Sequence, residues 1–184
     1  MPQESIKENI LEKTPKNIFL IGMMGSWKSS VGRLLAIELE MELIDTDDAI
    51  EEMTEMKISE IFSELWEAKF RDMESAFFIE KSIQTGYVFS TGGGIVLSKE
   101  NRNALQNNGT SILLKANPKI LANRLKNTQK RPLLSNSKEL ETRLTLIWNE
   151  RQTLYESSAH VTVDTDDLES VDVVQKILEQ RDRF

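Results

Sequence analysis

The chain has 184 residues, 39% hydrophobic and 29% charged, which predicts one soluble globular domain. A net charge of −7 argues against a nucleic-acid surface, because binding along phosphate backbones needs a basic stripe. No apolar run approaches the roughly 20 residues of a membrane span, and the absence of cysteine excludes thiolate metal sites and thiol nucleophiles. We expect a cytoplasmic protein that meets anionic ligands with a few arginines and lysines in one cleft.

The first 16 residues, MPQESIKENILEKTPK, have neither the basic region nor the apolar region of a signal peptide. They predict a short helix or a disordered lead-in. We expect residues 17–184 to form the single domain.

The rest of the chain alternates between short strand-like runs and helical patterns of about ten residues or more. This alternation predicts an α/β fold with a five-stranded parallel sheet, flanked by helices on both faces. Ligands of such sheets bind at the carboxyl ends of the strands. The predicted strands are residues 18–21, 42–44, 87–90, 111–115 and 160–163.

The central motif is NIFLIGMMGSWKSSVG, residues 17–32, in which an apolar run stops at a glycine and a helical pattern follows. A phosphate loop requires Gly, four free residues, Gly, Lys and Ser or Thr, because its backbone N–H groups wrap an anion at a helix N-terminus. Gly22, Lys28 and Ser29 meet this pattern, whereas Trp27 stands where the second glycine is expected. The motif predicts a phosphate loop, with Lys28 on the phosphates and Ser29 on Mg²⁺, or else a plain β–α turn.

The tetrapeptide DTDD occurs twice, at 45–48 and 164–167, each time after a strand-like run. In the first copy, alternate residues of an extended segment would point Asp45 and Asp47 toward one site. One carboxylate could then support Mg²⁺ through water while the other accepts a proton from an attacking hydroxyl. Capping of the next helix explains this copy equally well. For the second copy we predict N-capping of the final helix, residues 168–180.

Two further motifs lie near the predicted carboxyl ends of the strands. Arg71 and Glu74 are three residues apart on a helical stretch, which by itself predicts a surface ion pair. The segment STGGG, residues 90–94, ends the third predicted strand. Its three consecutive glycines leave backbone N–H groups bare and let a ligand approach closely, which predicts a ligand-binding loop.

Residues 127–139 are polar, show little periodicity and lie between two helical patterns, so they predict a mobile lid. Such a lid could carry Arg131 onto a transferring phosphoryl group, although a basic surface loop explains the residue equally well. Farther along, Glu150, Arg151 and Tyr155 share one face of a long predicted helix. Packing at the edge of the core and an ion pair on the exposed surface are sufficient to explain why these residues share a face.

Together these motifs resemble the shikimate kinase family, from about Asn17 to the C-terminus. Any one segment is weak evidence, whereas six segments in the family's order and roughly at its spacings are specific. The resemblance implies a nucleoside monophosphate kinase-like fold with a lid at 127–139 and an acceptor-binding region at 46–76. The matching segments are GMMGSWKSSVG, LIDTDD, FRDMES, STGGGIVL, KRPLL and ERQTLYESSA.

The resemblance also implies an activity, the ATP-dependent phosphorylation of the 3-hydroxyl of shikimate to give shikimate 3-phosphate and ADP. This step belongs to chorismate and aromatic amino-acid biosynthesis. Asp47 is the implied base, and Arg71 and Arg151 are implied to pair the shikimate carboxylate. The implied substrate-binding residues are Asp47, Arg71, Gly92, Gly93, Gly94 and Arg151.

For the co-substrate ATP, the resemblance implies catalytic roles for Lys28 and Arg131. Mg²⁺ would be bound by Ser29 and supported by Asp45 through water. The family suggests a monomer, and we expect neither a nucleic-acid nor a membrane partner. The implied nucleotide-binding residues are Gly25, Ser26, Trp27, Lys28, Ser29, Ser30, Arg124, Arg131 and Pro132, of which Arg124 and Pro132 would border the adenine.

Trp27 departs from the family's pattern, in which a bare glycine lets the main chain curl round the β-phosphate. If the position needs a positive φ, a non-glycine residue costs roughly 1–2 kcal/mol. We therefore expect a strained or displaced loop, rather than a loop that keeps its shape while the ring projects to solvent or packs on a neighbouring loop. The main hypothesis is an active kinase with a weakened phosphate loop. The alternatives are a catalytically impaired kinase-like protein that binds shikimate or a partner, and a kinase of another small polyol acid such as gluconate.

Overall fold

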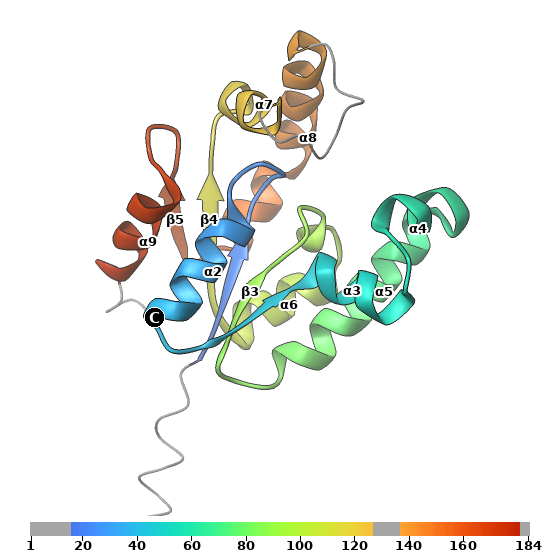
Figure 1. Ribbon diagram of the computed structural model, residues 1–184, viewed down its shortest axis with the longest axis horizontal. Helices are drawn as coiled ribbons and strands as arrows, with labels where there is room; N and C mark the ends of the chain where they lie inside the picture. The colour runs from blue at the N-terminus through green and yellow to red at the C-terminus, as the bar shows by residue number, and fades with distance from the viewer. Residues whose placement is uncertain (1–15, 127–136, 181–184) are drawn as a thin grey trace, which may run out of the picture.

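The computed structural model describes residues 16–126 and 137–180, and a five-stranded parallel sheet lies at its centre (Figure 1). The strand order is β2-β3-β1-β4-β5, with each neighbouring pair parallel. All five residues of β1 are buried, as expected for an apolar strand covered on both faces. The strands are β1 (Asn17–Ile21), β2 (Glu42–Asp45), β3 (Tyr87–Ser90), β4 (Gly109–Lys115) and β5 (Val161–Asp164).

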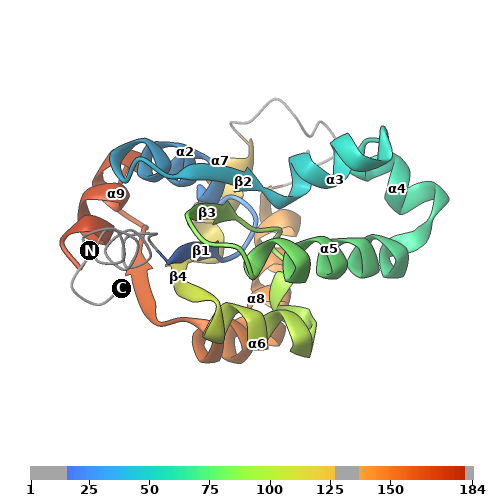
Figure 2. The same ribbon diagram turned by 90° about the horizontal axis from the view of Figure 1, so that it is seen from below.

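Helices cover both faces of the sheet, and Figure 2 shows α2 and α9 on one side and α6 and α8 on the other. The predicted α/β class and five-stranded parallel sheet are confirmed. The helices are α2 (Lys28–Glu38), α3 (Thr46–Thr54), α4 (Ile58–Glu64), α5 (Trp66–Ser82), α6 (Lys99–Asn107), α7 (Pro118–Lys126), α8 (Ser137–Ser158) and α9 (Ser170–Leu178), with a 3-10 turn η1 (Ile95–Leu97).

Each face of the sheet has its own apolar core. One core joins the strands to α5, α6, α7 and α8, and three phenylalanines, Phe19, Phe78 and Phe89, meet in it at ring separations of 5.1–5.7 Å. The other joins them to α2 and α9, for example through Leu35 and Ile177. Burial of such side chains stabilises the packing of each helical layer on the sheet by roughly 1.5–3 kcal/mol per residue. The sheet and its flanking helices therefore hold the loops at the ends of the strands in fixed relative positions.

A smaller apolar cluster lies away from the sheet, between α3, α4 and α5. Only Ile50, Ile61 and Phe70 are fully buried in it, and Phe62 packs beside Phe70 with ring centroids 5.0 Å apart. Figure 1 shows these helices projecting to one side of the sheet. We call α3, α4 and the first half of α5 the side lobe.

Several sequence-based expectations need correction. Asp47 lies in the first turn of α3 and not on an extended segment, because Asp45 ends β2 and caps that helix by accepting from the Asp47 N–H at 3.1 Å. The second DTDD does not cap the final helix, because the N-cap of α9 is Glu169, in a capping box with Asp172. Its aspartates instead order the preceding turn, where Asp166 Oδ1 accepts from the Asn117 N–H at 2.7 Å.

Two predicted segments fall partly or wholly outside the described residues. The lead-in ends at residue 16, the first described position, and the lid at 127–139 overlaps the described chain only at 137–139, which belong to α8. Within the described ranges, no helix is both long enough and apolar enough to cross a membrane.

Candidate functional site

The candidate site lies where β1, β2 and β3 end, so that three loops meet at one edge of the sheet. The segment 22–27 follows β1, Asp45 closes β2, and the triple glycine follows β3 (Figure 1). The register aligns Leu20 of β1 with Ser90 of β3, which in turn pairs with Asp45 of β2. Parallel strands therefore bring together motifs that are far apart in the sequence.

The loop after β1 has the backbone of an anion-binding loop. Gly22 and Gly25 have φ values of 143° and 82°, and a Cβ at Gly22 would collide with the Leu114 carbonyl oxygen. The side chain of Ser26 is buried, and its hydroxyl has no hydrogen-bond partner within the described parts of the chain. Ser30, in the first turn of α2, is exposed. The loop thus ends at a helix N-terminus, where backbone N–H groups and the helix dipole favour an anion, and the Ser26 hydroxyl adds a donor without a partner among the described residues.

Lys28 is folded back onto this loop. Its Nζ donates to the Gly22 and Met23 carbonyl oxygens, both at 2.8 Å, and the side chain is 9% exposed. Burial lowers the pKa of Lys28 to about 8, against the opposing effect of the nearby carboxylates Asp47 and Asp45. A plain β–α turn, the alternative interpretation of this motif, would leave the lysine on the surface, whereas Lys28 is buried. An ammonium held among carbonyl oxygens, with part of its charge uncompensated, is suited to a polyanionic ligand.

Trp27 has φ 68° and ψ 20°, a left-handed conformation, and is the N-cap of α2 without a side-chain cap. The expected positive φ is confirmed. The indole is half-buried and stacks under the Arg124 guanidinium, whose carbon lies 3.6 Å from the ring centroid. Arg124 also donates to Thr165 Oγ1 at 3.0 Å and to the Thr165 carbonyl oxygen. The strained backbone and the packed ring therefore occur together, although the sequence suggested them as alternatives.

Three oxygen-bearing side chains form a cluster beside the phosphate loop. Ser29 Oγ donates to Asp45 Oδ2 at 2.7 Å and lies 3.2 Å from Ser90 Oγ. Asp45 therefore both caps α3 and faces the phosphate loop, so the two interpretations of the first DTDD hold at once for this residue. Such hard oxygen ligands suit Mg²⁺, which usually keeps several waters and substrate phosphate oxygens around one or two protein ligands. Among the described residues, no group of three or more His, Cys, Asp and Glu side chains could hold a metal ion by itself.

Side chains of the side lobe fill the space beside two of the glycines after β3. A Cβ at Gly92 would collide with Glu74 Oε1 and lie 2.9 Å from Asp47 Oδ1, and a Cβ at Gly94 would collide with the Arg71 guanidinium. Gly92 is held by its N–H, which donates to Thr46 Oγ1 at 2.9 Å. The loop thus brings its backbone against Asp47 and Arg71 together.

Arg71 and Glu74 form the predicted ion pair at 2.7 Å, but it is not on the surface, because the Glu74 side chain is 1% exposed. Desolvation raises the pKa of Glu74, with Asp47 adding to the rise and Arg71 opposing it. Glu74 therefore fixes Arg71 at the loop from a buried position. Sequence reasoning treated Glu74 only as an ion-pair partner, and nothing in a three-residue spacing distinguishes a buried pair from an exposed one.

Arg151 reaches the same loop from α8 and donates from Nη1 to the Gly93 carbonyl oxygen at 3.2 Å. The Nε groups of Arg71 and Arg151 are both buried and lack a hydrogen-bond partner among the described residues. Buried N–H groups without a partner are rare in folded proteins, and each costs about 1–3 kcal/mol. Two such guanidinium groups at one glycine loop indicate an anionic ligand.

Sequence reasoning missed several side chains that order the site: Thr46, Ser90 and the hydroxyl of Tyr155. Thr46 lies within the LIDTDD motif and Ser90 within the STGGGIVL motif. Their position beside predicted site residues could have identified them. Arg131 and Pro132 lie outside the described residues.

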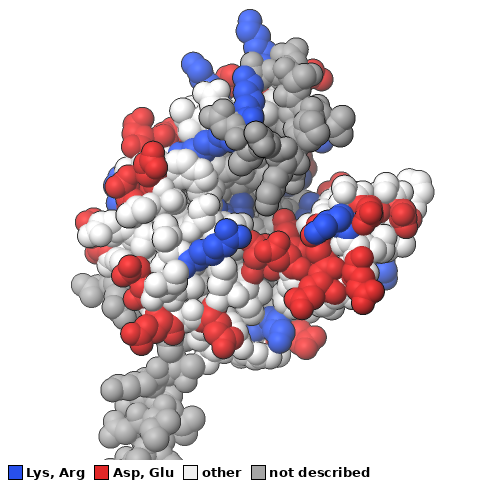
Figure 3. Space-filling model, in the orientation of Figure 1, with Lys and Arg blue, Asp and Glu red and all other residues white. Residues whose placement is uncertain are grey.

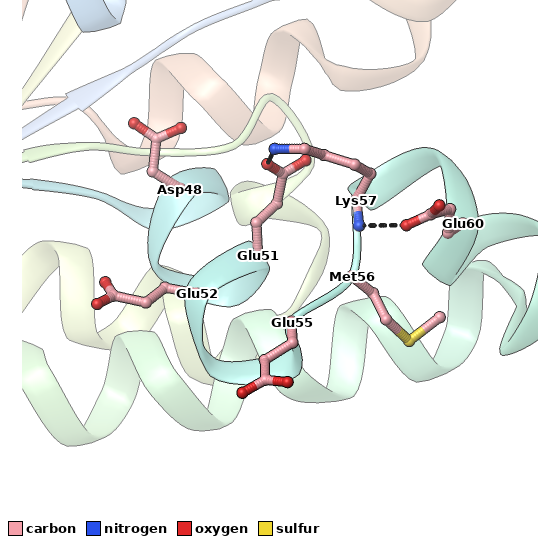
Figure 4. Close-up of a pocket in the computed structure, with 7 residues that line it drawn as sticks. All are labelled: Asp48, Glu51, Glu52, Glu55, Met56, Lys57 and Glu60. Atoms are coloured by element: carbon pink, nitrogen blue, oxygen red, sulfur yellow. Dashed lines mark hydrogen bonds and ion pairs between the residues drawn. The ribbon is translucent and has the colours of Figure 1, made fainter.

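A separate hollow between α3 and α4 has the opposite electrostatic character. Its lining includes Asp48, Glu51, Glu52, Glu55 and Glu60, with Lys57 bound to Glu51 at 2.6 Å (Figure 4). Figure 3 shows acidic side chains gathered over this part of the surface. Such a surface repels anions, so the two arginines and Lys28 mark the anion-binding site instead.

Comparisons with known proteins agree with this geometry. A family model described as shikimate kinase matches residues 24–182. A shikimate kinase of Thermodesulfovibrio yellowstonii is 40% identical over 92% of this chain and 96% of its own length. One from Legionella pneumophila strain Corby is 43% identical over 89% of this chain and 93% of its own.

Among solved structures, a shikimate kinase from Acinetobacter baumannii in complex with shikimate is similar, with a TM-score of 0.85 and 33% identity. The match covers 94% of this chain and 96% of that one. A gluconokinase from Sinorhizobium meliloti has a TM-score of 0.58 at 21% identity over 92% of this chain and 93% of its own, a likeness of fold alone.

Proposed function

This chain belongs to the shikimate kinase family, and on that premise we propose that it transfers the γ-phosphoryl group of ATP to the 3-hydroxyl of shikimate. The products are shikimate 3-phosphate and ADP. The observation that carries the proposal is the pair of buried Nε groups on Arg71 and Arg151, neither of which has a hydrogen-bond partner in the described part of the chain. A carboxylate placed between them accepts charge-assisted hydrogen bonds and removes the cost of leaving both donors unpaired.

The acceptor hydroxyls would lie against Asp47 and the loop of Gly92, Gly93 and Gly94. Asp47 faces this loop from α3, close to the position that a Cβ of Gly92 would take. As the 3-hydroxyl oxygen attacks the γ-phosphorus, Asp47 accepts its proton, and the bond from the γ-phosphorus to the bridging oxygen of ADP breaks. Positioning and charge neutralisation supply most of the rate acceleration in such transfers.

The phosphates of ATP would be held by the loop after β1. Backbone N–H groups and hydroxyls at Gly25, Ser26 and Ser30 surround the anion, and Lys28 turns from its carbonyl partners toward it. Arg124 would border the adenine with one face of its guanidinium. The indole of Trp27 lies against the other face of the guanidinium, with the guanidinium carbon 3.6 Å from the ring centroid. Arg131 at the γ-phosphate and Pro132 beside the adenine remain predictions, because both residues lie outside the described residues.

Mg²⁺ is the cofactor that the oxygen cluster beside the loop fits. Ser29 would bind the ion directly, and Asp45, 2.7 Å from the Ser29 hydroxyl, would hold its water shell. When bound, Mg²⁺ neutralises charge on the β- and γ-phosphates.

The alternative hypotheses receive less support. The catalytically impaired kinase was suggested by Trp27 alone, and the comparisons do not support it. A gluconate kinase would share the phosphate loop and fold but would not need the set formed by Arg71, the triple glycine and Arg151. We further propose that the protein acts as a cytoplasmic monomer. Its acidic net charge of −7 argues against a nucleic-acid partner.

A coupled assay of ADP release tests the proposal. We expect release with ATP and shikimate, and only background rates with gluconate or without an acceptor. Release at equal rates without an acceptor would reduce the function to ATP hydrolysis, and release only with gluconate would reassign the substrate.

The acceptor site is tested by Arg71→Ala and Arg151→Ala. Each removes a charge-assisted contact of roughly 1.5–3 kcal/mol, so the KM for shikimate should rise tenfold or more while ATP binding barely changes. Arg33, an exposed residue of α2, gives a matched control as Arg33→Ala. Equal losses of shikimate and ATP affinity in Arg71→Ala would contradict the assignment.

A further inference from the structure

One carbonyl oxygen in the acceptor loop is held by two donors from the same helix. Gly93 O accepts from Arg151 Nη1 at 3.2 Å and from the hydroxyl of Tyr155, which lies four residues farther along α8. Residues at this spacing share one face of a helix. A carbonyl oxygen has two lone pairs, and here α8 occupies both of them.

Tyr155 is a rigid source for this hydrogen bond. Its side chain is 0% exposed and belongs to the core on the α8 side of the sheet. Its ring stacks on Trp148 at an interplanar angle of 14° and a centroid separation of 6.1 Å. Burial raises the pKa of the hydroxyl to about 12, so it remains a proton donor throughout the physiological range.

Holding the Gly93 carbonyl also sets the direction of the next N–H group. In a trans peptide the C=O and N–H point to opposite sides, and no cis bond occurs in the described chain. With the carbonyl turned toward α8, the Gly94 N–H must point away from α8. Hydrogen bonds between described residues use the N–H of neither Gly93 nor Gly94, so both donors remain for a ligand.

We propose that Tyr155 is a positioning residue for the acceptor site. Its hydroxyl fixes the peptide between Gly93 and Gly94 and, through the shared carbonyl oxygen, the guanidinium of Arg151. A glycine loop has many accessible conformations, so without this hydrogen bond the loop must lose more conformational entropy when substrate binds. The inference rests on the proposed function because it concerns the same acceptor site.

Tyr155→Phe removes only the hydroxyl and keeps the ring in the core. Losing one hydrogen bond in the acceptor site should raise the KM for shikimate by about threefold to tenfold, with the KM for ATP changed less than twofold. The chain contains only one other tyrosine, Tyr87, whose hydroxyl bonds Gln84 at the surface. Tyr87→Phe is therefore the matched control and should leave both KM values unchanged.

The outcomes separate this inference from the proposed function. Equal increases in both KM values in Tyr155→Phe would indicate a merely structural role, and an unchanged KM for shikimate would also overturn the proposal. In both cases the unsubstituted chain would still release ADP with shikimate. Absence of that release in the unsubstituted chain would instead refute the proposed function.

A second measurement does not depend on the folding of Tyr155→Phe. In the Tyr87→Phe chain, biosynthetic 3-fluorotyrosine labels Tyr155 alone, so a single ¹⁹F resonance reports on its hydroxyl. We expect shikimate to shift that resonance saturably and ADP alone to leave it in place. A resonance that does not respond to saturating shikimate, in a chain that releases ADP with shikimate, would overturn the proposal.

Discussion

At the scale of single residues, Trp27 separates two effects that a substitution normally mixes. Its φ of 68° is present without any ligand, so the cost of about 1–2 kcal/mol belongs to folding and not to nucleotide binding. Its ring packs on Arg124 and on the core shared with α2 and α9, so the ring also stabilises the fold. The sequence alone assigned the strain to ATP affinity because it does not show the backbone of the unliganded loop.

A pair of variants tests this separation. Trp27→Ala removes the ring but keeps the unfavourable φ, whereas Trp27→Gly removes both. The glycine variant should therefore be more stable than the alanine variant by about 1 kcal/mol in urea unfolding, with equal ADP affinities by calorimetry. Tighter ADP binding by the glycine variant alone would show that the strain acts on binding after all. The difference in unfolding free energy between Trp27→Ala and the unsubstituted chain measures how much the packing of the indole ring stabilises the fold.

Lys28 predicts a proton linked to nucleotide binding. With a pKa of about 8 in the free protein, Lys28 is largely neutral at pH 8.5, and a polyanion beside it favours the charged form. ADP binding should therefore take up a fraction of a proton at pH 8.5. Nucleotide phosphates are fully ionised at pH 8.5 and do not contribute.

Calorimetry in two buffers of different ionisation enthalpy measures this uptake. The association constant of ADP should also fall as the pH rises above about 8, because neutral Lys28 attracts the phosphates less. Lys28→Met gives the control and should show no linked proton at pH 8.5. Proton release, or no uptake at pH 8.5 by the unsubstituted chain, would contradict the lowered pKa.

At the scale of the elements, α5 begins at a strained residue. Trp66 has a φ of 67° and is 78% exposed, and its N-cap, Leu65, makes no side-chain cap. Because an exposed ring contributes little packing, Trp66→Gly should stabilise the fold by about 1 kcal/mol, which is about 2–4 °C in Tm for a chain of this size. Lys69→Gly, at an exposed helical position of the same helix, should destabilise it by a similar amount. A lower Tm for Trp66→Gly would show that the indole has a role in packing.

The elements also show where sequence reasoning succeeds. Strands β1 to β5 were predicted to within two residues at each end. The reason is clearest for β1, β3 and β4, because strands that are largely buried in a parallel sheet contain short apolar runs. The cap of α9 was missed because Asp164 and Asp166 resemble caps locally, while the choice of Glu169 depends on a reciprocal bond with Asp172. Likewise, Arg71 could be predicted from a motif, but its buried partner and its contact with Gly94 depend on how the side lobe packs.

At the scale of the whole molecule, the acceptor site joins parts of unequal stability. Arg151 and Gly93 belong to the sheet and its larger core, whereas Asp47 and Arg71 belong to the side lobe, whose core has three fully buried apolar side chains. Regions with few buried apolar contacts open at a lower free energy than the main core. A ligand held between the arginines therefore links the weaker part to the stronger part.

This link predicts the pattern of amide hydrogen exchange. Without ligand, α4 should exchange faster than β1 and β4. Because opening the side lobe breaks the acceptor site, shikimate at 100 times its Kd should slow that opening by up to about a hundredfold, corresponding to about 2.7 kcal/mol. ADP alone should protect the loop after β1 and the start of α2 but leave α4 unchanged. In Arg71→Ala, whose affinity for shikimate is expected to be tenfold or more lower, the same shikimate concentration should slow the opening by about tenfold or less. Exchange in α4 that is already as slow as in β1, or that does not respond to shikimate in the unsubstituted chain, would show that the lobe and the sheet open as one unit.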